Sequence, residues 1–521
     1  MLFTVLIALV VLALLGAVYL REQKSVPAGT RQPDGPPGKP LVGNLLDIPP
    51  YHSWLQFFKW SKQFGPLYRL NLAGQEHVIV STESIANDLL RERGTLYSSR
   101  AYLPMATELL SHNLRPLLLP YGDTWRNGRK LMHNLTNVSV AASYEAIQDE
   151  ESIRAVRDLL REPTKYETWL ERYSAGLTLR LAYSKPVVTG DEPFVRQVLK
   201  VVHTVERVAS PGAYLVDTFP ILMKLPRFLA PFKREGDRLH KEEIDLFRSL
   251  LAEGTAANQE NFCTKWHSSR ESYDLSDDHV AYVIGTLFEA GAGTTSAAMQ
   301  SFLLAMTLHP AEYALLQKDI DSVVGPERMP TFDDLPQLPR VRAVAKEVLR
   351  WRPVTAGGLP HMLVKDDVYK LPSGDSVFLK AGTCVHPVQW SIHREEKLYP
   401  DPESFRPERW LDSQWPTFRE PLEKFPNLQS YSAFGFGRRI CPGLNIAERS
   451  LYVLIMRIAW AADIRAVKDG QGRALLPPSY DYVTGFNVQP KPFKFDLTIR
   501  SGQQDVVEKH YQEVWGSSRN E

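Results

Sequence analysis

The 521-residue chain is poor in cysteine and almost free of net charge. Its three cysteines, Cys263, Cys384 and Cys441, lie far apart and form no CxxC pair, which excludes a disulfide framework and a zinc site built from cysteine pairs. Lysine and arginine total 61 against 60 aspartate and glutamate, and a net charge of +1 offers no general attraction to nucleic acid. With 44% hydrophobic and 23% charged residues, the composition predicts a globular protein with no nucleic-acid partner.

One long apolar run occupies the N-terminus. Residues 2–20 carry no charge, and as a helix they would rise roughly 28 Å, the thickness of a bilayer's hydrocarbon core. Basic residues follow the run at Arg21 and Lys24 and none precedes it, so the positive-inside rule leaves the rest of the chain in the cytosol. A cleaved signal peptide is the alternative, but the basic start of such a peptide is missing. We expect a transmembrane anchor over residues 1–20.

The rest of the chain divides by composition into a linker, one large body and a tail. Residues 21–50 are rich in proline and glycine and predict an extended spacer. Residues 51–502 show no internal repeat, and they predict one mainly helical domain with two short strands at 67–72 and 77–81. Residues 503–521 are polar and predict a loose C-terminal tail.

A long helix is expected over residues 276–308. Ser276 can cap its N-terminus, and His309 followed by proline ends it. Its centre, residues 289–295, reads EAGAGTT, a run of small residues and poor helix formers. Two interpretations stay open for this centre: close packing against another helix, or a groove in which a ligand approaches the backbone.

The strongest chemical signal is the segment FGFGRRICPG at residues 434–443, followed by a predicted helix over residues 444–461. Cys441 therefore lies just before a helix N-terminus, where backbone N–H groups and the helix dipole favour a thiolate. The glycines let a flat ligand approach the main chain, and Arg439 offers a positive charge to an acidic group on it. A single cysteine ligand suits haem iron, whereas zinc needs three or four ligands. The alternative is a basic, glycine-rich loop with a buried cysteine.

This segment resembles the haem-binding signature F-x-x-G-x-R-x-C-x-G of the cytochrome P450 monooxygenases. Three further segments occur in the expected order: AGAGTT at 290–295 is similar to the family's [AG]-G-x-[DE]-T-T, EVLR at 347–350 to its E-x-x-R, and PERW at 407–410 to its P-E-R-[FW]. The resemblance implies a mainly α fold with small β-sheets and a single large catalytic domain. It also implies haem b as the cofactor, with an axial thiolate from Cys441 to the iron.

The resemblance further implies which side chains bind the haem propionates. Trp125 and Arg129 match the family's W-x-x-x-R helix, and one helical turn between them lets both reach one carboxylate. Arg439 is implied as another partner of the same groups. His361 stands where the family often has an arginine or histidine for this task, although an isolated histidine is more often structural.

Thr294 is implied as the catalytic residue that helps deliver protons to iron-bound dioxygen, because a hydroxyl can both donate and accept. The chain departs from the family pattern just before it, where Gly293 replaces the usual acid. Proton delivery is then expected through water or, less favourably, through Glu289, which is five residues away and on another face.

Glu347 and Arg350 share one face of a helix, where they can pair. Such spacing usually means a solvated surface pair worth under about 1 kcal/mol. The resemblance instead implies a buried triad with Arg409, close to the cysteine loop.

These expectations combine into a membrane-anchored haem-thiolate monooxygenase that inserts one oxygen atom from O₂ into an apolar organic substrate. The chain has no dinucleotide fingerprint, so electrons are expected from NADPH–cytochrome P450 reductase, with Arg126, Lys130 and Arg438 as docking candidates. The resemblance to fungal microsomal members places the protein in the endoplasmic reticulum membrane, with a cytosolic catalytic domain, and in secondary metabolite biosynthesis.

Other classes stay open. A haem-thiolate isomerase, dehydratase or peroxygenase would need no reductase, and retention of Thr294 argues mildly against it. A non-catalytic haem-binding membrane protein and a cofactor-free scaffold are the remaining alternatives. The resemblance implies these substrate-facing candidates: residues 100–119, Ala290, residues 354–359 and Phe486.

Overall fold

The computed structural model describes residues 26–190, 192–210, 212–418 and 431–516. Helices dominate this part of the chain, which confirms the mainly α prediction. The α-helices are α2 (Ser53–Phe64), α3 (Glu83–Asn87), α4 (Gly94–Tyr97), α5 (Asp123–Thr136), α6 (Val138–Ala142), α7 (Glu145–Arg161), α8 (Tyr166–Tyr183), α9 (Pro193–Val208), α10 (Leu215–Thr218), α11 (Pro231–Thr255), α12 (Phe262–Ser268), α13 (Asp277–Leu308), α14 (Pro310–Val324), α15 (Pro339–Trp351), α16 (Gln389–Ile392), α17 (Leu444–Ala461) and α18 (Gln503–Trp515).

The strands of the described residues are short and form four small sheets. They are β1 (Leu67–Leu72), β2 (Gln75–Val80), β3 (His361–Met362), β4 (Asp367–Lys370), β5 (Ser376–Leu379), β6 (Cys384–Pro387), β7 (Ala462–Arg465), β8 (Val467–Lys468), β9 (Ala474–Leu475) and β10 (Asp496–Ile499). The largest sheet has the order β1-β2-β6-β3, and β2 runs parallel to β6. The second strand of the predicted hairpin begins two residues earlier than expected, because Gly74 at φ +94° makes a turn tight enough for Leu72 to pair with Gln75.

No helix within the described residues is both long and apolar enough to cross a membrane. The predicted anchor, residues 1–20, lies outside the described residues.

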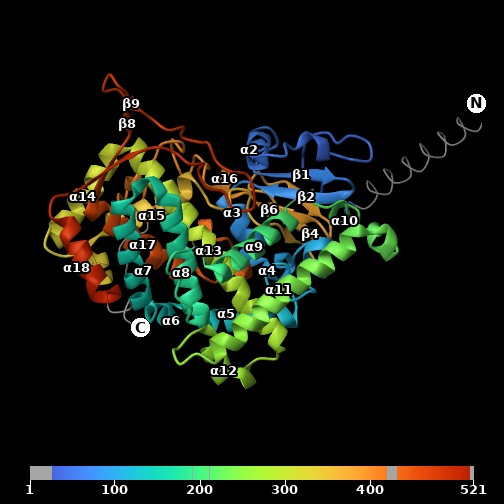
Figure 1. The fold of residues 1–521 in the computed structure, drawn as a ribbon. Helices are drawn as coiled ribbons and strands as arrows, with labels where there is room; N and C mark the ends of the chain where they lie inside the picture. The colour runs from blue at the N-terminus through green and yellow to red at the C-terminus, as the bar shows by residue number, and fades with distance from the viewer. Residues whose placement is uncertain (1–25, 191, 211, 419–430, 517–521) are drawn as a thin grey trace, which may run out of the picture.

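Helix α13 runs through the centre of the helical body, where it contacts α8, α11, α5, α15 and α17 (Figure 1). Its bounds agree with the prediction, and the Ser276 hydroxyl accepts a hydrogen bond from the backbone N–H of His279. The small residues at its centre allow both close packing against another helix and the approach of a ligand, the two interpretations that the sequence left open. A side chain at Gly291 would collide with Thr178 of α8, whereas Ala290 and Thr294 line a cavity.

The proline-rich segment before the body packs against the sheets instead of standing apart as a spacer. The backbone N–H of Arg31 donates to the carbonyl of Ser376, and the backbone N–H of Phe378 donates to the carbonyl of Arg31. Asn44 is 2% exposed and binds the backbone of Asn71 through its side chain. The sequence predicts an extended spacer over residues 21–50. Over residues 26–50 this extended segment lies against the body, because its backbone groups find partners on β1 and β5.

The predicted loose tail is also different in the structure, because residues 503–515 form helix α18 on the surface of α7 (Figure 1). Val507 is 1% exposed. The Trp515 ring lies 4.3 Å from the Arg154 guanidinium carbon and 5.5 Å from that of Arg180, and its indole N–H donates to the carbonyl of Glu150. The polar composition of this segment predicted a tail without structure. The segment forms a helix because its few apolar and aromatic side chains contact the core and the guanidiniums of neighbouring helices.

Candidate active site

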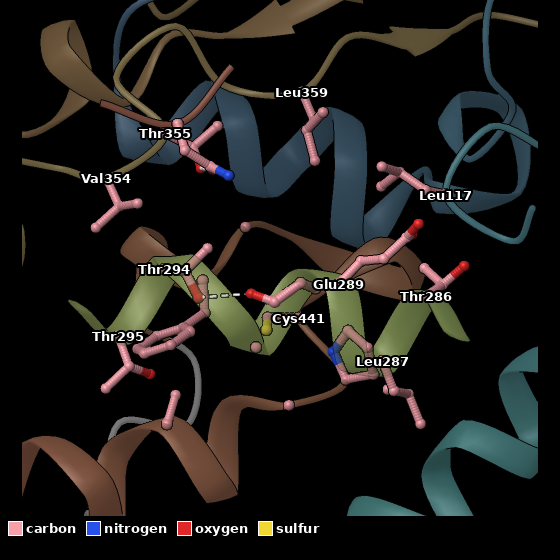
Figure 2. Close-up of a pocket in the computed structure, with 18 of the residues that line it drawn as sticks. Leu117, Thr286, Leu287, Glu289, Thr294, Thr295, Val354, Thr355, Leu359 and Cys441 are labelled. Carbon is pink, nitrogen blue, oxygen red and sulfur yellow. Dashed lines mark hydrogen bonds between the residues drawn. The ribbon is translucent and has the colours of Figure 1, made fainter. Parts of the chain in front are cut away.

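A cavity of about 360 Å³ is lined by α13, by the cysteine loop (residues 431–443) and by α5, α8 and α9. Figure 2 shows Thr294 and Glu289 on α13, with Val354, Thr355 and Leu359 on another segment of the cavity wall. Most of the wall is apolar. The candidates named from the sequence, Trp125, Arg129, Thr294, His361, Arg439 and Cys441, all line this one cavity.

The cysteine loop is held in shape by its own backbone and by a close neighbour. The backbone N–H of Cys441 donates to the carbonyl of Phe434 at 2.9 Å. Gly437 has a φ of +56°, and a side chain there would collide with the carbonyl oxygen of Leu90 in the π-helical turn η2 (Asp88–Glu92). Only glycine fits both conditions. Helix α17 begins at Leu444, as predicted, so that Cys441 lies just ahead of its N-terminus.

The surroundings of the Cys441 thiol act on it in opposite directions. Burial raises the pKa of the thiol, whereas hydrogen bonds from the backbone N–H groups of Gly443 and Leu444 and the charge of Arg129 lower it. A helix N-terminus and a neighbouring guanidinium are the groups that stabilise a thiolate. The described residues contain no cluster of three or more His, Cys, Asp or Glu side chains suited to a metal ion.

Two glycines beside Cys441 leave room for a flat group. A side-chain carbon at Gly435 or Gly443 would meet no atom within 4 Å, and both residues line the cavity. Side chains there would therefore enter the space in front of the cysteine. A planar ligand that lies against the main chain fits this cradle.

Three guanidinium groups border the same cavity without a carboxylate partner among the described residues. Arg439 donates to the carbonyls of Ser98, Pro116 and Leu119, and Arg129 donates to that of Ile440. Arg100 donates to the carbonyls of Leu117, Leu359 and Pro360. Burial lowers the pKa of Arg439 to about 8, with Arg100 and Arg129 adding to this effect, and burial lowers the pKa of Arg100 to about 10. Buried cations of this kind suit a ligand with acidic groups, such as the two propionates of haem.

Trp125 and His361 stand beside these cations. The guanidinium carbon of Arg439 lies 4.3 Å from the centre of the Trp125 ring, and Arg129 follows one turn later on α5. His361 is 3% exposed, and its Nδ1 lies 2.8 Å from the carbonyl oxygen of Tyr97. Burial and the charge of Arg100 lower the pKa of His361 well below its usual value. The neutral ring then donates from Nδ1 to the carbonyl, and Nε2 is an acceptor.

Thr294 and Glu289 have different surroundings on α13. The Thr294 hydroxyl donates to the carbonyl of Ala290 at 2.8 Å, which leaves its oxygen free to accept (Figure 2). The Glu289 carboxylate pairs through Oε2 with Arg115, which also pairs with Glu243 of α11. The Glu289 carboxylate is thus paired with a guanidinium, whereas the Thr294 hydroxyl binds the backbone of its own helix.

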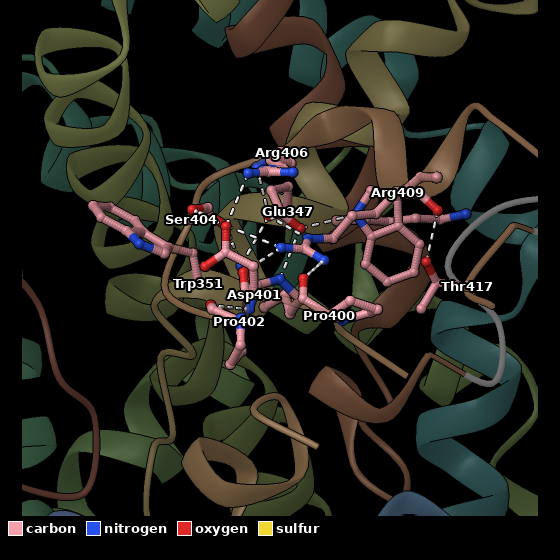
Figure 3. Close-up of polar contacts among 12 residues, drawn as sticks. Glu347, Trp351, Pro400, Asp401, Pro402, Ser404, Arg406, Arg409 and Thr417 are labelled. Atoms are coloured by element: carbon pink, nitrogen blue, oxygen red, sulfur yellow. Dashed lines mark hydrogen bonds and ion pairs between the residues drawn. The ribbon is translucent and has the colours of Figure 1, made fainter. Parts of the chain in front are cut away.

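Behind the cavity wall, the predicted ion cluster is fully buried. Glu347, Arg350 and Arg409 are each 0% exposed. Arg350 donates to both carboxylate oxygens of Glu347 at 2.8 Å, and Arg409 Nε lies 3.4 Å from Oε1. The indole of Trp410 and the backbone N–H of Arg406 donate to the same carboxylate (Figure 3). The surface-pair alternative is therefore excluded.

The cluster connects to the cysteine loop through His393. Arg350 donates to the carbonyl of His393 at 3.1 Å, and His393 Nε2 lies 3.1 Å from the hydroxyl of Ser432 at the start of that loop. Gln389 donates to the carbonyl of Ser432 as well. Loss of the cluster would therefore disturb the loop that carries Cys441.

Comparison with known proteins agrees with this geometry. The family model for cytochrome P450 matches residues 33–469. The chain belongs to the cytochrome P450 family. Cytochrome P450 monooxygenase fogE of Aspergillus ruber is 34% identical over 93% of this chain and 89% of its own. A monooxygenase of Postia placenta, number 58, is 35% identical over 90% and 89%, and one from Armillaria gallica is 33% identical over 98% and 97%.

A solved structure of a zebrafish cytochrome P450 with abiraterone shares the fold, with a TM-score of 0.67, 23% sequence identity, and coverage of 86% of this chain and 99% of the other. The protein is a cytochrome P450 monooxygenase whose cofactor is haem, held by a cysteine thiolate.

Two features of the site were not predicted from the sequence. Arg100 was named only as part of a substrate-facing loop, although its guanidinium stands with Arg129 and Arg439. The Arg115 network with Glu243 and Glu289 was not expected at all. No local signal marks either arginine, because their partners lie far away in sequence.

Proposed function

We propose that this P450 inserts one oxygen atom from O₂ into an apolar organic substrate, and that the Cys441 thiolate would hold the iron of haem b. One observation carries the proposal: a single cavity is lined by Cys441, by Thr294, and by three guanidiniums that have no carboxylate partner in the described part of the chain. Haem supplies the activation of dioxygen, to which a thiolate ligand adds electron density. The residues of the chain bind the cofactor, exclude water and position a proton source.

Arg129, Arg439 and Trp125 hold the propionates, and Arg100 joins them. Each of the three guanidiniums donates hydrogen bonds to backbone carbonyls. These bonds fix the orientation of the guanidinium without the cofactor. His361 lines the cavity with Arg100, and it could join these guanidiniums only as an imidazolium, because Nδ1 already donates to the Tyr97 carbonyl. The negative charge of a bound propionate would favour that second proton, against the effect of burial and of Arg100.

Thr294 positions the proton source. Its hydroxyl hydrogen is directed at the Ala290 carbonyl, so the oxygen accepts a hydrogen bond from a water molecule in the cavity. Glu289 is paired with Arg115, and Gly293 brings no acid. Water is therefore the direct donor in this mechanism.

Electrons come from NADPH through a separate cytochrome P450 reductase. A basic surface suited to an acidic partner lies near the cysteine loop, where the guanidiniums of Arg126 and Arg438 lie 5.5 and 5.3 Å from the Tyr121 ring centre. Lys130 follows Arg126 by one turn of α5, and its ammonium donates to the carbonyl of Ser272. Arg126 also pairs with the exposed Asp123, and Arg438 and Lys130 leave this surface with a surplus of positive charge. Such a surplus steers association with an acidic partner.

The protein acts at the endoplasmic reticulum membrane, in secondary metabolite biosynthesis. The apolar run at residues 2–20 and the basic residues after it support a single-pass anchor with a cytosolic catalytic domain. The relatives named above come from fungi, and the cavity wall is mostly apolar, which fits a small organic metabolite.

The test is spectroscopic and chemical. The reduced protein under carbon monoxide is expected to show the red-shifted band of a thiolate-bound haem, and Cys441→Ser is expected to abolish that band, whereas Cys384→Ser leaves it in place. Product that gains one oxygen atom should form only when reductase, NADPH and O₂ are all present. An unaltered band in Cys441→Ser contradicts the ligand assignment, and turnover without NADPH and O₂ would instead favour an isomerase or dehydratase.

A further inference from the structure

The wall of the cavity that α9 contributes carries a carboxylate with no part in holding the cofactor. Glu206 lines the cavity, and its side chain is 34% exposed. Its Oε1 accepts a hydrogen bond from Nδ2 of Asn487 at 3.1 Å, and its Oε2 lies 3.7 Å from Nδ1 of His203. A carboxylate has about four acceptor positions, so these two contacts leave part of its capacity unused.

Asn487 is oriented by a second contact. The Thr355 hydroxyl donates to Oδ1 of Asn487 at 3.5 Å, which directs the amide nitrogen toward Glu206. The three residues come from three separate segments, and all of them line the cavity. Their neighbours in the wall are apolar: Val202, Val205, Ala209, Val354 and Phe486. The polar group is thus flanked by apolar side chains, as an orienting group in a ligand pocket is.

A second carboxylate of the same cavity lacks full compensation. Glu289 is nine-tenths buried and its Oε2 pairs with Arg115. Its Oε1 is buried, and no described residue forms a hydrogen bond with it. Arg115 is shared with Glu243, so one guanidinium serves two carboxylates. Burial raises the pKa of Glu289, and the nearby Glu206 carboxylate acts in the same direction, against the effect of Arg115. Glu206 and the Oε1 of Glu289 therefore give this part of the cavity a surplus of hydrogen-bond acceptors.

We propose that Glu206, oriented by Asn487, selects substrates that carry a hydrogen-bond donor, a hydroxyl or an ammonium group, on an otherwise apolar skeleton. A donor fills the free acceptor positions of Glu206, whereas a substrate carboxylate would add another negative charge beside Glu206 and Glu289. The apolar remainder of the substrate covers the apolar wall. This inference rests on the proposed function, because it assigns the substrate class of the same cavity.

The experiment compares four probes of one skeleton by equilibrium dialysis against the haem-loaded protein: 4-phenylphenol, 4-phenylbenzylamine, 4-methoxybiphenyl and 4-phenylbenzoate. The phenol and the amine have a donor, the ether has none, and the benzoate is an anion. We expect at least one of the two donor probes to bind about ten-fold or more tightly than the ether and the benzoate, as one charge-assisted hydrogen bond allows. The order of phenol and amine distinguishes a hydroxyl-bearing substrate from an ammonium-bearing one.

Variants connect the preference to Glu206. Glu206→Leu should reduce the advantage of the donor probes over the ether to under about two-fold, and Glu206→Gln should remove the advantage of the amine more than that of the phenol, because an amide accepts without charge. Asn487→Leu is a second, independent variant that should weaken the same preference. Glu242→Gln is the matched control. Glu242 lies on α11, where its carboxylate pairs with the exposed Lys200 of α9, and it does not line the cavity.

Two results would overturn the inference: an ether or benzoate that binds as tightly as both donor probes, or a donor preference that Glu206→Leu leaves unchanged. The carbon monoxide spectrum is recorded on the same samples. If the spectrum is normal but the donor probes bind no more tightly than the ether, only this inference is wrong. If the red-shifted band is missing, the haem-thiolate assignment is wrong, and the dialysis does not test that assignment.

Discussion

Nη2 of Arg129 donates a hydrogen bond of 2.6 Å to the carbonyl oxygen of Ile440, the residue immediately before Cys441. This contact joins α5 to the cysteine loop, and the same charge lowers the pKa of the Cys441 thiol. One side chain therefore fixes the backbone of the loop, favours the thiolate and faces the space for the cofactor.

Arg129→Leu should lose haem rather than only slow turnover. Removal of the guanidinium leaves the Ile440 carbonyl without its donor, at a cost of about 1–3 kcal/mol, and takes away a cation for the propionates. The measurement is haem per protein after purification, together with the free energy of unfolding. Arg238→Leu, at a side chain that is 58% exposed, is the control and should keep its haem. Full haem content in Arg129→Leu would contradict the propionate role.

Glu347→Gln should destabilise the protein strongly although it changes neither size nor shape. The carboxylate accepts from Arg350, Arg409 and Trp410, and its neutral replacement leaves two buried guanidiniums uncompensated. The expected loss is about 3–5 kcal/mol of unfolding free energy, accompanied by loss of haem.

The matched control for this cluster is Glu408→Gln in the neighbouring segment. Glu408 is 37% exposed and pairs with Arg340, so the same substitution should cost under about 1 kcal/mol there. Equal effects of the two substitutions in urea unfolding would show that the buried cluster has no special role.

Thr294→Ala should separate NADPH consumption from product formation. Without the hydroxyl the water in the cavity loses its acceptor, so product per NADPH is expected to fall by up to about 10²-fold while peroxide rises. Thr307→Ala removes a hydroxyl with the same contact to the carbonyl four residues earlier, far along α13 and outside the cavity wall. That variant should stay coupled, and uncoupling of both would point to a general effect on the helix.

Reversal of charge on the proposed docking surface should slow electron transfer. Arg126→Glu and Arg438→Glu are expected to reduce the rate of haem reduction by the reductase and to flatten its dependence on salt, because screened attraction brings the partners together. Arg238→Glu provides a reversal elsewhere on the surface. Rates and salt dependence that match the unaltered protein would place the reductase on another face.

Asp217→Asn should stabilise the protein at neutral pH and leave it unchanged in acid. Burial raises the pKa of Asp217 from 3.8 to about 6, against the hydrogen bond from the backbone N–H of Met105. A carboxyl whose pKa is raised by folding favours the folded state fully below pH 3.8, and this contribution is lost as pH rises through about 6. An amide still accepts from Met105 and carries no charge.

The difference in unfolding free energy between Asp217→Asn and the unaltered protein should therefore grow between about pH 4 and pH 6 and then stay level. Asp245→Asn, whose carboxylate pairs with Lys241 on the outer face of α11, should show no such rise. A difference that is the same at every pH would exclude titration of Asp217 as the cause.

The sequence predicted the helices and the motif that depend on residues close together in the chain. The bounds of α13 and α17 follow from apolar spacing and from the residues that start and end a helix, Ser276 and His309 among them. Cys441 was identified because ten consecutive residues carry its motif. The burial of Glu347 came from the family resemblance, since spacing alone favoured a surface pair.

The remaining features depend on contacts between distant parts of the chain. Arg115 meets Glu289, 174 positions away, and α18 is stabilised by Arg154 and Arg180 on α7 and α8. No regular spacing in the sequence indicates either of these contacts. The composition of residues 503–515 is that of a solvent-exposed segment. Electrostatic and aromatic contacts of this kind become visible only when the fold brings the groups together.

The hydrogen bonds between Arg31 and the strand β5 determine where the N-terminal part of the chain meets the catalytic body. Because these bonds and the contact of Asn44 with Asn71 hold the segment at the sheets, a force on the N-terminus acts first on the sheets. If the N-terminus is attached to a surface, these few contacts restrict how the catalytic body, and with it the cavity, can be oriented relative to that surface. Shortening residues 26–50 should for this reason distort the sheets, whereas insertions ahead of residue 26 should change only the distance to that surface.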